Sequence, residues 1–198
     1  MIIHINGMPG VGKLTVAQIL AQKLPARLID NHRLIDAATT CCEHGSPAYV
    51  KVLHKITNIV FDELRTLPPG EIIIFTNALA DQCPEDIARF DSCRQLAESR
   101  NEEFLAVLLT CSIESNIRRV SDSSRALKGK LVREERLLEL LEQYSIYHPD
   151  TEKHKIEIDT THLEPAESAR IIQETAERLR TCPIIQDEGE QQTNEIIH

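Results

Sequence analysis

The chain has 198 residues, of which 41% are hydrophobic and 27% are charged, a balance typical of a folded globular domain. Acidic residues outnumber basic residues by 31 to 22, and the resulting net charge of −9 argues against nucleic acid or an anionic membrane as a partner. No apolar run approaches the roughly 20 residues of a membrane-spanning helix. The six cysteines are scattered and form no C-x-x-C pair, so we expect reduced thiols in a cytoplasmic protein.

Five short apolar runs rich in β-branched residues alternate with longer segments of helical periodicity. Several of these runs are apolar almost throughout, as strands covered on both faces are. The alternation predicts right-handed βαβ units and an α/β fold, in which helices cover both faces of a doubly wound, five-stranded parallel sheet. The predicted strands are Ile2–Asn6, Arg27–Ile29, Glu71–Phe75, Phe104–Thr110 and Lys155–Ile158.

Prolines and small polar residues mark the ends of the helices between these strands. Ser46 as N-cap and Pro47 in the first turn open one helix, and Pro25 ends the helix that follows the first strand. The segment after Pro183 is polar and acidic, which indicates a flexible tail. The predicted helices span about 13–23, 47–67, 84–100, 113–120, 131–147 and 165–180.

A glycine-rich loop, GMPGVGKLT, joins the first strand to the first helix and contains a complete G-x-x-x-x-G-K pattern. Glycines let the backbone curl so that successive N–H groups point at phosphate oxygens, and the start of the helix adds the positive end of its dipole. Lys13 then reaches the β- and γ-phosphates as a mobile positive charge. The hydroxyl departs from the commonest pattern, because Leu14 follows the lysine and Thr15 comes one position later.

This loop resembles that of the small P-loop kinases, the group of nucleoside monophosphate, shikimate and gluconate kinases, many of which carry GxPGxGKGT. The resemblance extends more loosely over residues 1 to about 180 and implies the sheet order 2-3-1-4-5, a small helical lid and ATP-dependent phosphoryl transfer. One kinase domain is then expected over 1–182, with its lid at about 118–134 and an acidic flexible tail over 183–198. The residues that the resemblance assigns to nucleotide binding are Gly7, Pro9, Gly10, Val11, Gly12, Lys13, Leu14, Thr15 and Arg119.

Magnesium is expected from the chemistry of ATP rather than from a cluster of ligands in the chain. Leu14 stands where a hydroxyl residue commonly follows the lysine, so its side chain cannot bind the ion. Phosphate oxygens and water should therefore supply most of the ligands. Thr15 is the candidate protein ligand.

The acceptor side of the site is predicted at the carboxyl ends of the second and third strands, where parallel sheets bind their ligands. By resemblance, Asp30 is the candidate base for the acceptor hydroxyl, although it could instead cap the following helix. His32 and Arg33 either face the acceptor or lie in solvent. Asn77 follows the third strand, where many P-loop proteins carry an aspartate, and either orients the acceptor or a metal-bound water or serves as a turn residue.

Basic residues gather over 118–133 in an otherwise acidic chain. In the kinase group this is the lid, whose arginines neutralise charge on the transferred phosphoryl group. The resemblance makes Arg125 the first candidate for that role, followed by Arg119 and Arg133. Any one of these residues could instead belong to a solvated helix face. The loop after the last strand, Asp159–His162, should border the adenine.

The predicted activity is transfer of the γ-phosphoryl group of ATP to a hydroxyl of a small molecule, with Lys13, Asp30 and Arg125 as catalytic residues. A polyol, sugar, hydroxy acid or antibiotic fits better than a nucleotide, because nucleotide-kinase signatures are missing and aromatic residues make up only 4% of the chain. A nucleoside or nucleotide kinase, and a non-catalytic ATP-binding regulatory protein, are the alternatives. We expect a monomer or homodimer whose partners are ATP and the acceptor.

Overall fold

A computed structural model of the protein describes residues 1–121 and 133–181. Five parallel strands form a single sheet in the order β2-β3-β1-β4-β5, which confirms the predicted α/β class and strand order. Among the described residues, no helix is both long enough and apolar enough to cross a membrane. The strands are β1 (Ile2–Asn6), β2 (Ala26–Asp30), β3 (Ile72–Thr76), β4 (Phe104–Thr110) and β5 (Lys155–Asp159).

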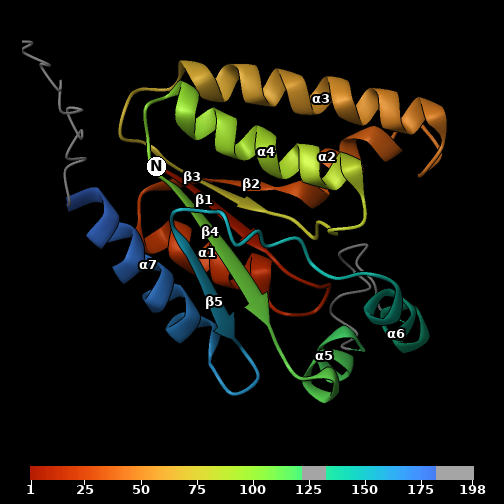
Figure 1. The fold of residues 1–198 in the computed structure, drawn as a ribbon. Helices are drawn as coiled ribbons and strands as arrows, with labels where there is room; N and C mark the ends of the chain where they lie inside the picture. Colours follow the sequence, from red (N-terminus) through yellow and green to blue (C-terminus); the bar gives the residue numbers. More distant parts are fainter. Residues whose placement is uncertain (122–132, 182–198) are drawn as a thin grey trace, which may run out of the picture.

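Helices cover both faces of the sheet and give the molecule three layers (Figure 1). The helices α1 and α7 lie on one face, and α3 and α4 lie on the other, with α2 packed against α3. The helices α5 and α6 lie beyond the carboxyl end of β4. The helix bounds are α1 (Lys13–Lys23), α2 (Asn31–Thr39), α3 (Pro47–Thr66), α4 (Pro84–Ser99), α5 (Ile113–Val120), α6 (Glu134–Gln143) and α7 (Pro165–Thr181).

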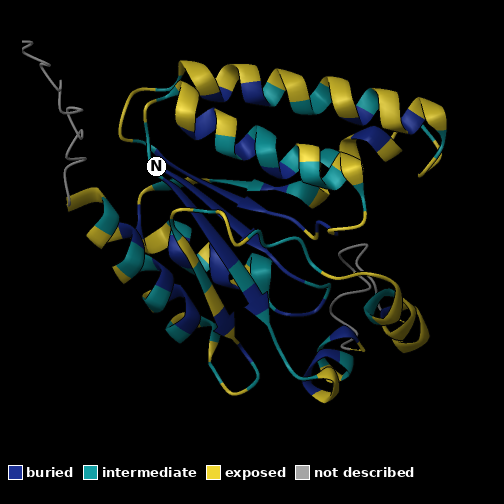
Figure 2. Cartoon of the chain, in the orientation of Figure 1, coloured by how far each residue is buried: buried dark blue, intermediate teal, exposed yellow. Residues whose placement is uncertain are grey.

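Burial follows the position of each strand in the sheet. Every residue of β1 and β3 is buried, whereas the edge strands β2 and β5 are partly exposed (Figure 2). Side chains of β1 alternate between the two layers, so Ile3 packs towards α1 and α7 while Ile2 packs towards α3 and α4. A third, smaller cluster of Ala38, Tyr49 and Leu53 joins α2 to α3 away from the sheet.

The predicted N-cap at Ser46 is present. The Ser46 hydroxyl accepts a hydrogen bond from the Tyr49 N–H at 3.1 Å, with Pro47 in the first turn. The predicted helix over 131–147 was wrong at its carboxyl end, because α6 ends at Gln143 and Ile146 instead forms an antiparallel bridge with Ala80. Residues 122–132, which hold most of the predicted lid, and the predicted tail over 183–198 lie outside the described residues.

Buried hydrogen bonds fasten the segment between α6 and β5 to the middle of the sheet. The side chain of Asn6, at the end of β1, accepts a hydrogen bond from the Leu79 N–H at 2.9 Å and donates one to the Tyr147 carbonyl at 2.9 Å. Asn6 is 1% exposed. One side chain thereby fixes the loop that follows β3 and the segment that precedes β5.

A second polar cluster closes the opposite end of the sheet. The Glu102 carboxylate lies 2.6 Å from the amino group of Met1 and 2.9 Å from the Arg100 guanidinium, which also donates to the Leu64 carbonyl at 2.8 Å. Burial by itself would raise the pKa of Glu102, but hydrogen bonds from Arg100, Met1 and the Gly70 N–H hold that pKa below its ordinary value. The cluster therefore stabilises the charged carboxylate.

Candidate active site

The phosphate-binding loop can form only with glycine at its most crowded position. Gly10 has φ +97°, and a Cβ there would lie 2.1 Å from Asn116 Oδ1 and 2.7 Å from a methyl carbon of Val120. Both contacts come from α5, so the backbone of the loop packs directly against side chains of that helix. Gly12, with φ +100°, precedes α1 and leaves open space at its own Cβ position. The loop is thus shaped by backbone conformation at Gly12 and by close packing at Gly10.

Lys13 opens α1 and reaches back over the loop. Its ammonium donates hydrogen bonds to the carbonyl oxygens of Gly7 at 2.6 Å and Met8 at 2.9 Å. The first turn of α1 contains no acidic side chain. The ammonium and the N-terminal end of the helix therefore face the same loop, an arrangement that favours an anion such as a nucleotide phosphate.

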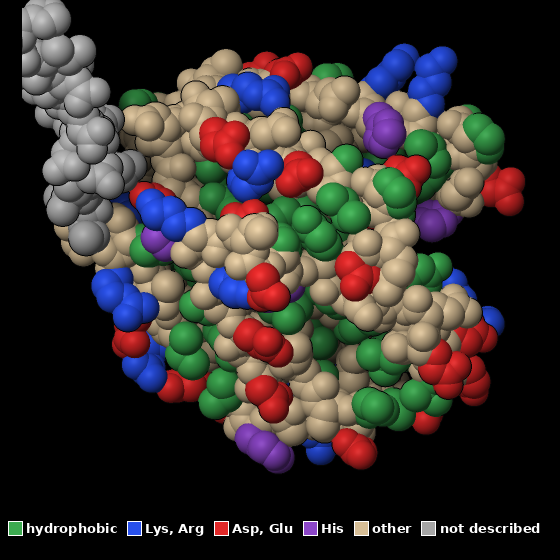
Figure 3. Space-filling model, viewed as in Figure 1, with side chains coloured by type: hydrophobic (Ala, Val, Ile, Leu, Met, Phe, Trp, Pro, Cys, Tyr) green, Lys and Arg blue, Asp and Glu red, His purple; other side chains and the backbone are tan. Residues whose placement is uncertain are grey.

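A pocket of about 260 Å³ brings this loop together with the ends of β2 and β3. It opens at the carboxyl end of the sheet, and the surface is hollowed between the part formed by α2 and α3 and the part formed by α5 and α6 (Figure 3). Gly7 and Val11, which were also predicted to bind the nucleotide, do not line the pocket, and Val11 is 2% exposed. The predicted nucleotide-binding residues that line the pocket are Pro9, Gly10, Gly12, Lys13, Leu14 and Thr15.

Asp30 caps the following helix and also lines the pocket. Its Oδ1 caps α2 by accepting from the His32 N–H at 3.2 Å, and also accepts from the Thr76 hydroxyl at 3.3 Å. The side chain is 8% exposed and lines the pocket, where Oδ2 has no hydrogen-bond donor among the described residues. His32 also lines the pocket, whereas Arg33 is exposed and does not. One carboxylate oxygen thus caps the helix, and the side chain also lines the pocket.

The residue after β3 is an amide backed by a buried histidine. Asn77 lines the pocket, and its Oδ1 lies 3.1 Å from Nε2 of His4, a fully buried residue of β1. The His4 ring packs against Phe90 and Phe104, with centroid distances of 5.0 and 6.3 Å. Burial lowers the pKa of His4 to about 4, and the hydrogen bond to Asn77 Oδ1 offsets only part of that effect. His4 is therefore neutral at pH 7.

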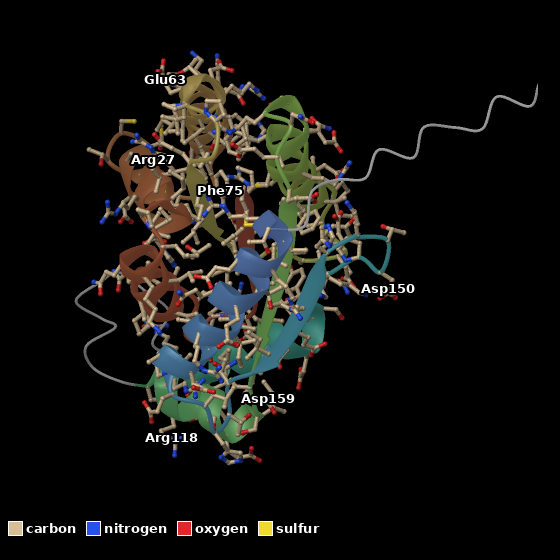
Figure 4. The ribbon with its side chains drawn as sticks, turned by 90° about the vertical axis from the view of Figure 1, so that its left-hand side faces the viewer. Arg27, Glu63, Phe75, Arg118, Asp150 and Asp159 are labelled. Carbon is tan, nitrogen blue, oxygen red and sulfur yellow. The ribbon has the colours of Figure 1, made fainter. Side chains whose placement is uncertain are left out.

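Arg119 joins the loop after β5 to the phosphate-binding loop. Its guanidinium donates to the hydroxyl of Thr160 at 2.8 Å and to the carbonyl of Thr160 at 2.6 Å, and that hydroxyl lies 3.1 Å from the Val11 carbonyl oxygen. Figure 4 shows the neighbouring Arg118 at the surface of α5, at the same end of the molecule as Asp159. Arg133 is exposed next to the start of α6, and Arg125 lies outside the described residues.

The oxygen donors in the pocket suit magnesium once phosphates are present. The pocket is lined by one carboxylate, Asp30, and by the exposed hydroxyl residue Thr15. Mg²⁺ commonly takes one or two protein oxygens and completes its shell with phosphates and water. Within residues 1–121 and 133–181, no group of three or more His, Cys, Asp or Glu side chains could hold a metal by itself. The residues present fit an Mg²⁺ ion that binds together with the nucleotide.

Two polar residues near the pocket had not been singled out from the sequence, although their spacing carried a signal. Arg89 shares a helix face with the buried residues Cys93 and Leu96 of α4, and Thr57 shares one with Leu53 and Phe61 of α3. A charged or hydroxyl residue on an otherwise apolar stripe indicates a polar role inside the fold. Both line a narrow cavity beside the pocket.

Comparison with known proteins places the chain in a family. The sequence profile described as AAA domain matches residues 3–142, more than half of the 198 residues, and this span includes the phosphate-binding loop and Asp30. The chain belongs to this AAA domain family. No curated protein matches the sequence significantly.

Solved structures resemble this AAA domain chain over most of its length. A candidate kinase from Chloroflexus aurantiacus has a TM-score of 0.66 at 16% identity, covering 90% of this chain and 96% of its own. A gluconokinase from Sinorhizobium meliloti has a TM-score of 0.56 at 16% identity, covering 89% and 91%. A shikimate kinase from Acinetobacter baumannii, solved with shikimate, has a TM-score of 0.54 at 20% identity, covering 86% and 89%. The chain has the fold of the small P-loop kinases, as its phosphate-binding loop predicted.

Proposed function

We propose that this protein transfers the γ-phosphoryl group of ATP to a hydroxyl group of a small molecule. The observation that carries the proposal is that Lys13 of the phosphate-binding loop and Asp30 at the end of β2 line one pocket. A cation for the phosphates and a carboxylate for the acceptor are the two groups that this reaction needs on facing sides. The kinase names of the structural neighbours support the same reaction class.

The chemistry assigned to the chain follows from these two groups. The loop amides and Lys13 bind the phosphate chain, and Lys13 stabilises the negative charge that develops on the leaving ADP. Thr15, together with phosphate oxygens, would hold Mg²⁺, which would supply further neutralisation of phosphate charge. The oxygen of the acceptor hydroxyl bonds to the γ-phosphorus, and the bond from that phosphorus to the bridging β,γ-oxygen breaks. Asp30 Oδ2 accepts the proton that the hydroxyl loses. The products are ADP and a phosphate ester.

The remaining predicted roles stay proposals. Arg125 is assigned to the charge on the transferred group, and Arg119 to the nucleotide. The cytoplasmic location and the monomeric or homodimeric state are expectations from the sequence.

The direct test measures ATP binding by calorimetry and ATP turnover with a panel of polyols, sugars and hydroxy acids. Lys13→Met should lower transfer at least about 100-fold, whereas Lys23→Met, an exposed lysine at the other end of α1, should leave it unchanged. Tighter binding of GTP than of ATP would contradict the assignment. Firm ATP binding without transfer to any acceptor would favour a regulatory nucleotide-binding protein.

A further inference from the structure

The side-chain amide of Asn77 lies beside the start of the phosphate-binding loop. The backbone N–H of Asn77 donates to the Ile5 carbonyl at 3.0 Å, which ties the end of β3 to the end of β1. The side chain lines the same pocket as Lys13 and is only 6% exposed. An amide in this place can face the pocket with its oxygen or with its NH₂ group, and the two ends bind different chemical groups.

The ring of His4 carries one proton, and its surroundings determine which nitrogen holds that proton. Burial keeps His4 neutral at pH 7, so one ring nitrogen is a donor and the other is an acceptor. Nδ1 is buried and has no hydrogen-bond partner among the described residues. A proton on Nδ1 would be a buried donor without an acceptor, which is rare in folded proteins, whereas Nε2 lies 3.1 Å from Asn77 Oδ1. The proton therefore belongs on Nε2.

This tautomer fixes the orientation of the Asn77 amide. Nε2–H of His4 donates to Asn77 Oδ1, so the amide oxygen is held against a fully buried ring that packs on Phe90 and Phe104. The other end of the amide, Nδ2, forms no hydrogen bond with any described residue. Because Oδ1 and Nδ2 diverge from one carbon atom, the NH₂ group is the end left for a ligand in the pocket.

An NH₂ group in this place suits an oxygen atom that carries negative charge. It can donate to a phosphate oxygen, but it offers no lone pair to a metal-bound water, which itself needs an acceptor. The Lys13 ammonium lies 2.6 Å from the carbonyl oxygen of Gly7, and Gly7 closely follows Ile5, the residue bonded to Asn77. A phosphate bound by Lys13 is therefore also beside the amide of Asn77.

We propose that His4 is a positioning residue of the active site, which holds the Asn77 amide so that its NH₂ group donates a hydrogen bond to the phosphoryl group being transferred. This inference rests on the proposed function and adds two residues to its machinery. Asn77 would then stabilise the charge that spreads over the phosphoryl oxygens. Of the roles that the sequence left open for Asn77, binding of a metal-bound water does not fit this orientation.

The first measurement determines the tautomer of His4 in the ligand-free protein. Long-range proton–nitrogen correlation spectra at pH 7 distinguish the protonated ring nitrogen from the unprotonated one. Signals that disappear in His4→Gln identify this residue among the eight histidines of the chain. We expect a neutral ring with its proton on Nε2. A ring protonated on Nδ1, or one that is charged at pH 7, would overturn the proposal.

The second measurement separates the terminal phosphate from the rest of the nucleotide by comparing ADP with a β,γ-imido analogue of ATP, each with Mg²⁺. Asn77→Leu removes the donor and should weaken binding of the analogue at least about tenfold without changing that of ADP. Asn77→Asp sets a carboxylate against the phosphate and should weaken the analogue at least as much. Asn58→Asp adds the same charge at an exposed position of α3 and should bind both nucleotides like the wild type.

Two outcomes of this comparison contradict the proposal. Wild-type or tighter binding of the analogue by Asn77→Asp would indicate that the side chain faces the metal. An equal loss for ADP and the analogue in Asn77→Leu would place the contact away from the terminal phosphate. If the wild type itself fails to bind the analogue, the proposed function is refuted and this inference with it, whereas normal binding with unaffected Asn77 variants refutes this inference alone.

A double-mutant cycle measures the contribution of His4. His4→Phe keeps an aromatic ring but removes the Nε2–H, so the Asn77 oxygen would turn towards water in the pocket. Affinity for the analogue should then fall about threefold to tenfold, whereas the same change made in Asn77→Leu should have no effect. His4→Gln, which keeps an N–H donor, should retain most of the affinity. Equal effects of His4→Phe with and without the amide would show that His4 supports only the fold.

Discussion

Arg119 and Thr160 form a two-point contact in which one guanidinium holds both the hydroxyl and the carbonyl of a single residue. The same hydroxyl lies within hydrogen-bond distance of the Val11 carbonyl oxygen, inside the phosphate-binding loop. Through this contact α5, the loop after β5 and the nucleotide-binding backbone are held in one arrangement. Arg119 thereby supports the backbone of this loop through Thr160.

Thr160→Val should loosen that arrangement without changing the volume of the side chain. We expect ATP affinity to fall about tenfold and the free energy of unfolding to fall by about 1–2 kcal/mol, since a half-buried guanidinium loses one acceptor. Calorimetry and urea denaturation measure the two effects. Thr39→Val, which removes a hydroxyl bonded only within its own helix, should change neither. Wild-type ATP affinity in Thr160→Val would show that the contact does not support the loop.

Asp30 offers a way to separate catalysis from helix capping. Asp30→Asn keeps a side-chain oxygen for the His32 N–H but removes the base, so kcat should fall at least about 100-fold with little change in stability. Asp30→Ala should lose the same activity and about 1 kcal/mol of stability as well. Turnover and urea denaturation distinguish the pair. Turnover by Asp30→Asn at the wild-type rate would show that Asp30 is not the base.

Alanine substitutions at Gly10 and Gly12 compare the stability cost of a steric collision with that of a strained backbone. Alanine at Gly12 meets no neighbouring atom, so its cost should be the left-handed backbone alone, about 1–2 kcal/mol. Alanine at Gly10 also collides with Asn116 and should cost at least about 1 kcal/mol more. Adding Asn116→Ala to Gly10→Ala should recover part of the stability. Equal stability of the two single variants, measured by urea denaturation, would contradict this packing.

His4 should make stability depend on pH. Its pKa is about 4 in the folded protein and 6.5 when unfolded, so between these values the unfolded chain binds more protons. The free energy of unfolding should therefore fall by about 3 kcal/mol as pH decreases from 6.5 to 4, with no contribution from this group above that window. His4→Gln keeps a neutral N–H donor and does not titrate. Subtracting its pH profile, measured by urea denaturation, from that of the wild type should isolate the effect; parallel profiles would refute it.

Glu102 and Glu71 compare a buried with an exposed ion pair. Glu102→Gln leaves Arg100, whose side chain is 3% exposed, without its counter-charge and should cost about 2 kcal/mol. Glu71→Gln breaks the exposed pair with Arg27 and should change stability little. Thermal denaturation of the two variants checks the contrast. A similar loss in both would show that burial does not set the strength of the Glu102 cluster.

Local patterns were sufficient to predict most of the fold. The run IIHIN could be recognised as a strand covered on both faces because isoleucines occur on both of them, and Ser46-Pro47 marked a helix start that the structure confirms. The end of α6 could not be found in this way. Residues beyond Gln143 leave the helix because the segment pairs with Ala80, a partner more than 60 residues away in the sequence.

In the candidate site, too, features within one stretch of sequence could be predicted, whereas contacts between distant segments could not. The phosphate-binding loop is contiguous in sequence, so its residue types and spacing were enough to locate it. Asp30 and Asn77 could be placed at strand ends, but their partners Thr76 and His4 come from neighbouring strands. His4 sits in an apolar strand, and nothing in its local sequence distinguishes a core histidine from one that orients a distant amide.

The small cluster of Ala38, Tyr49 and Leu53 packs α2 against α3 away from the sheet. The start of α3 therefore packs on α2, whereas Phe61 and Leu64 nearer its end pack against the sheet. Because this cluster shares no residue with the core beneath α1 and α7, protein engineers can vary it while leaving the packing behind the phosphate-binding loop unchanged.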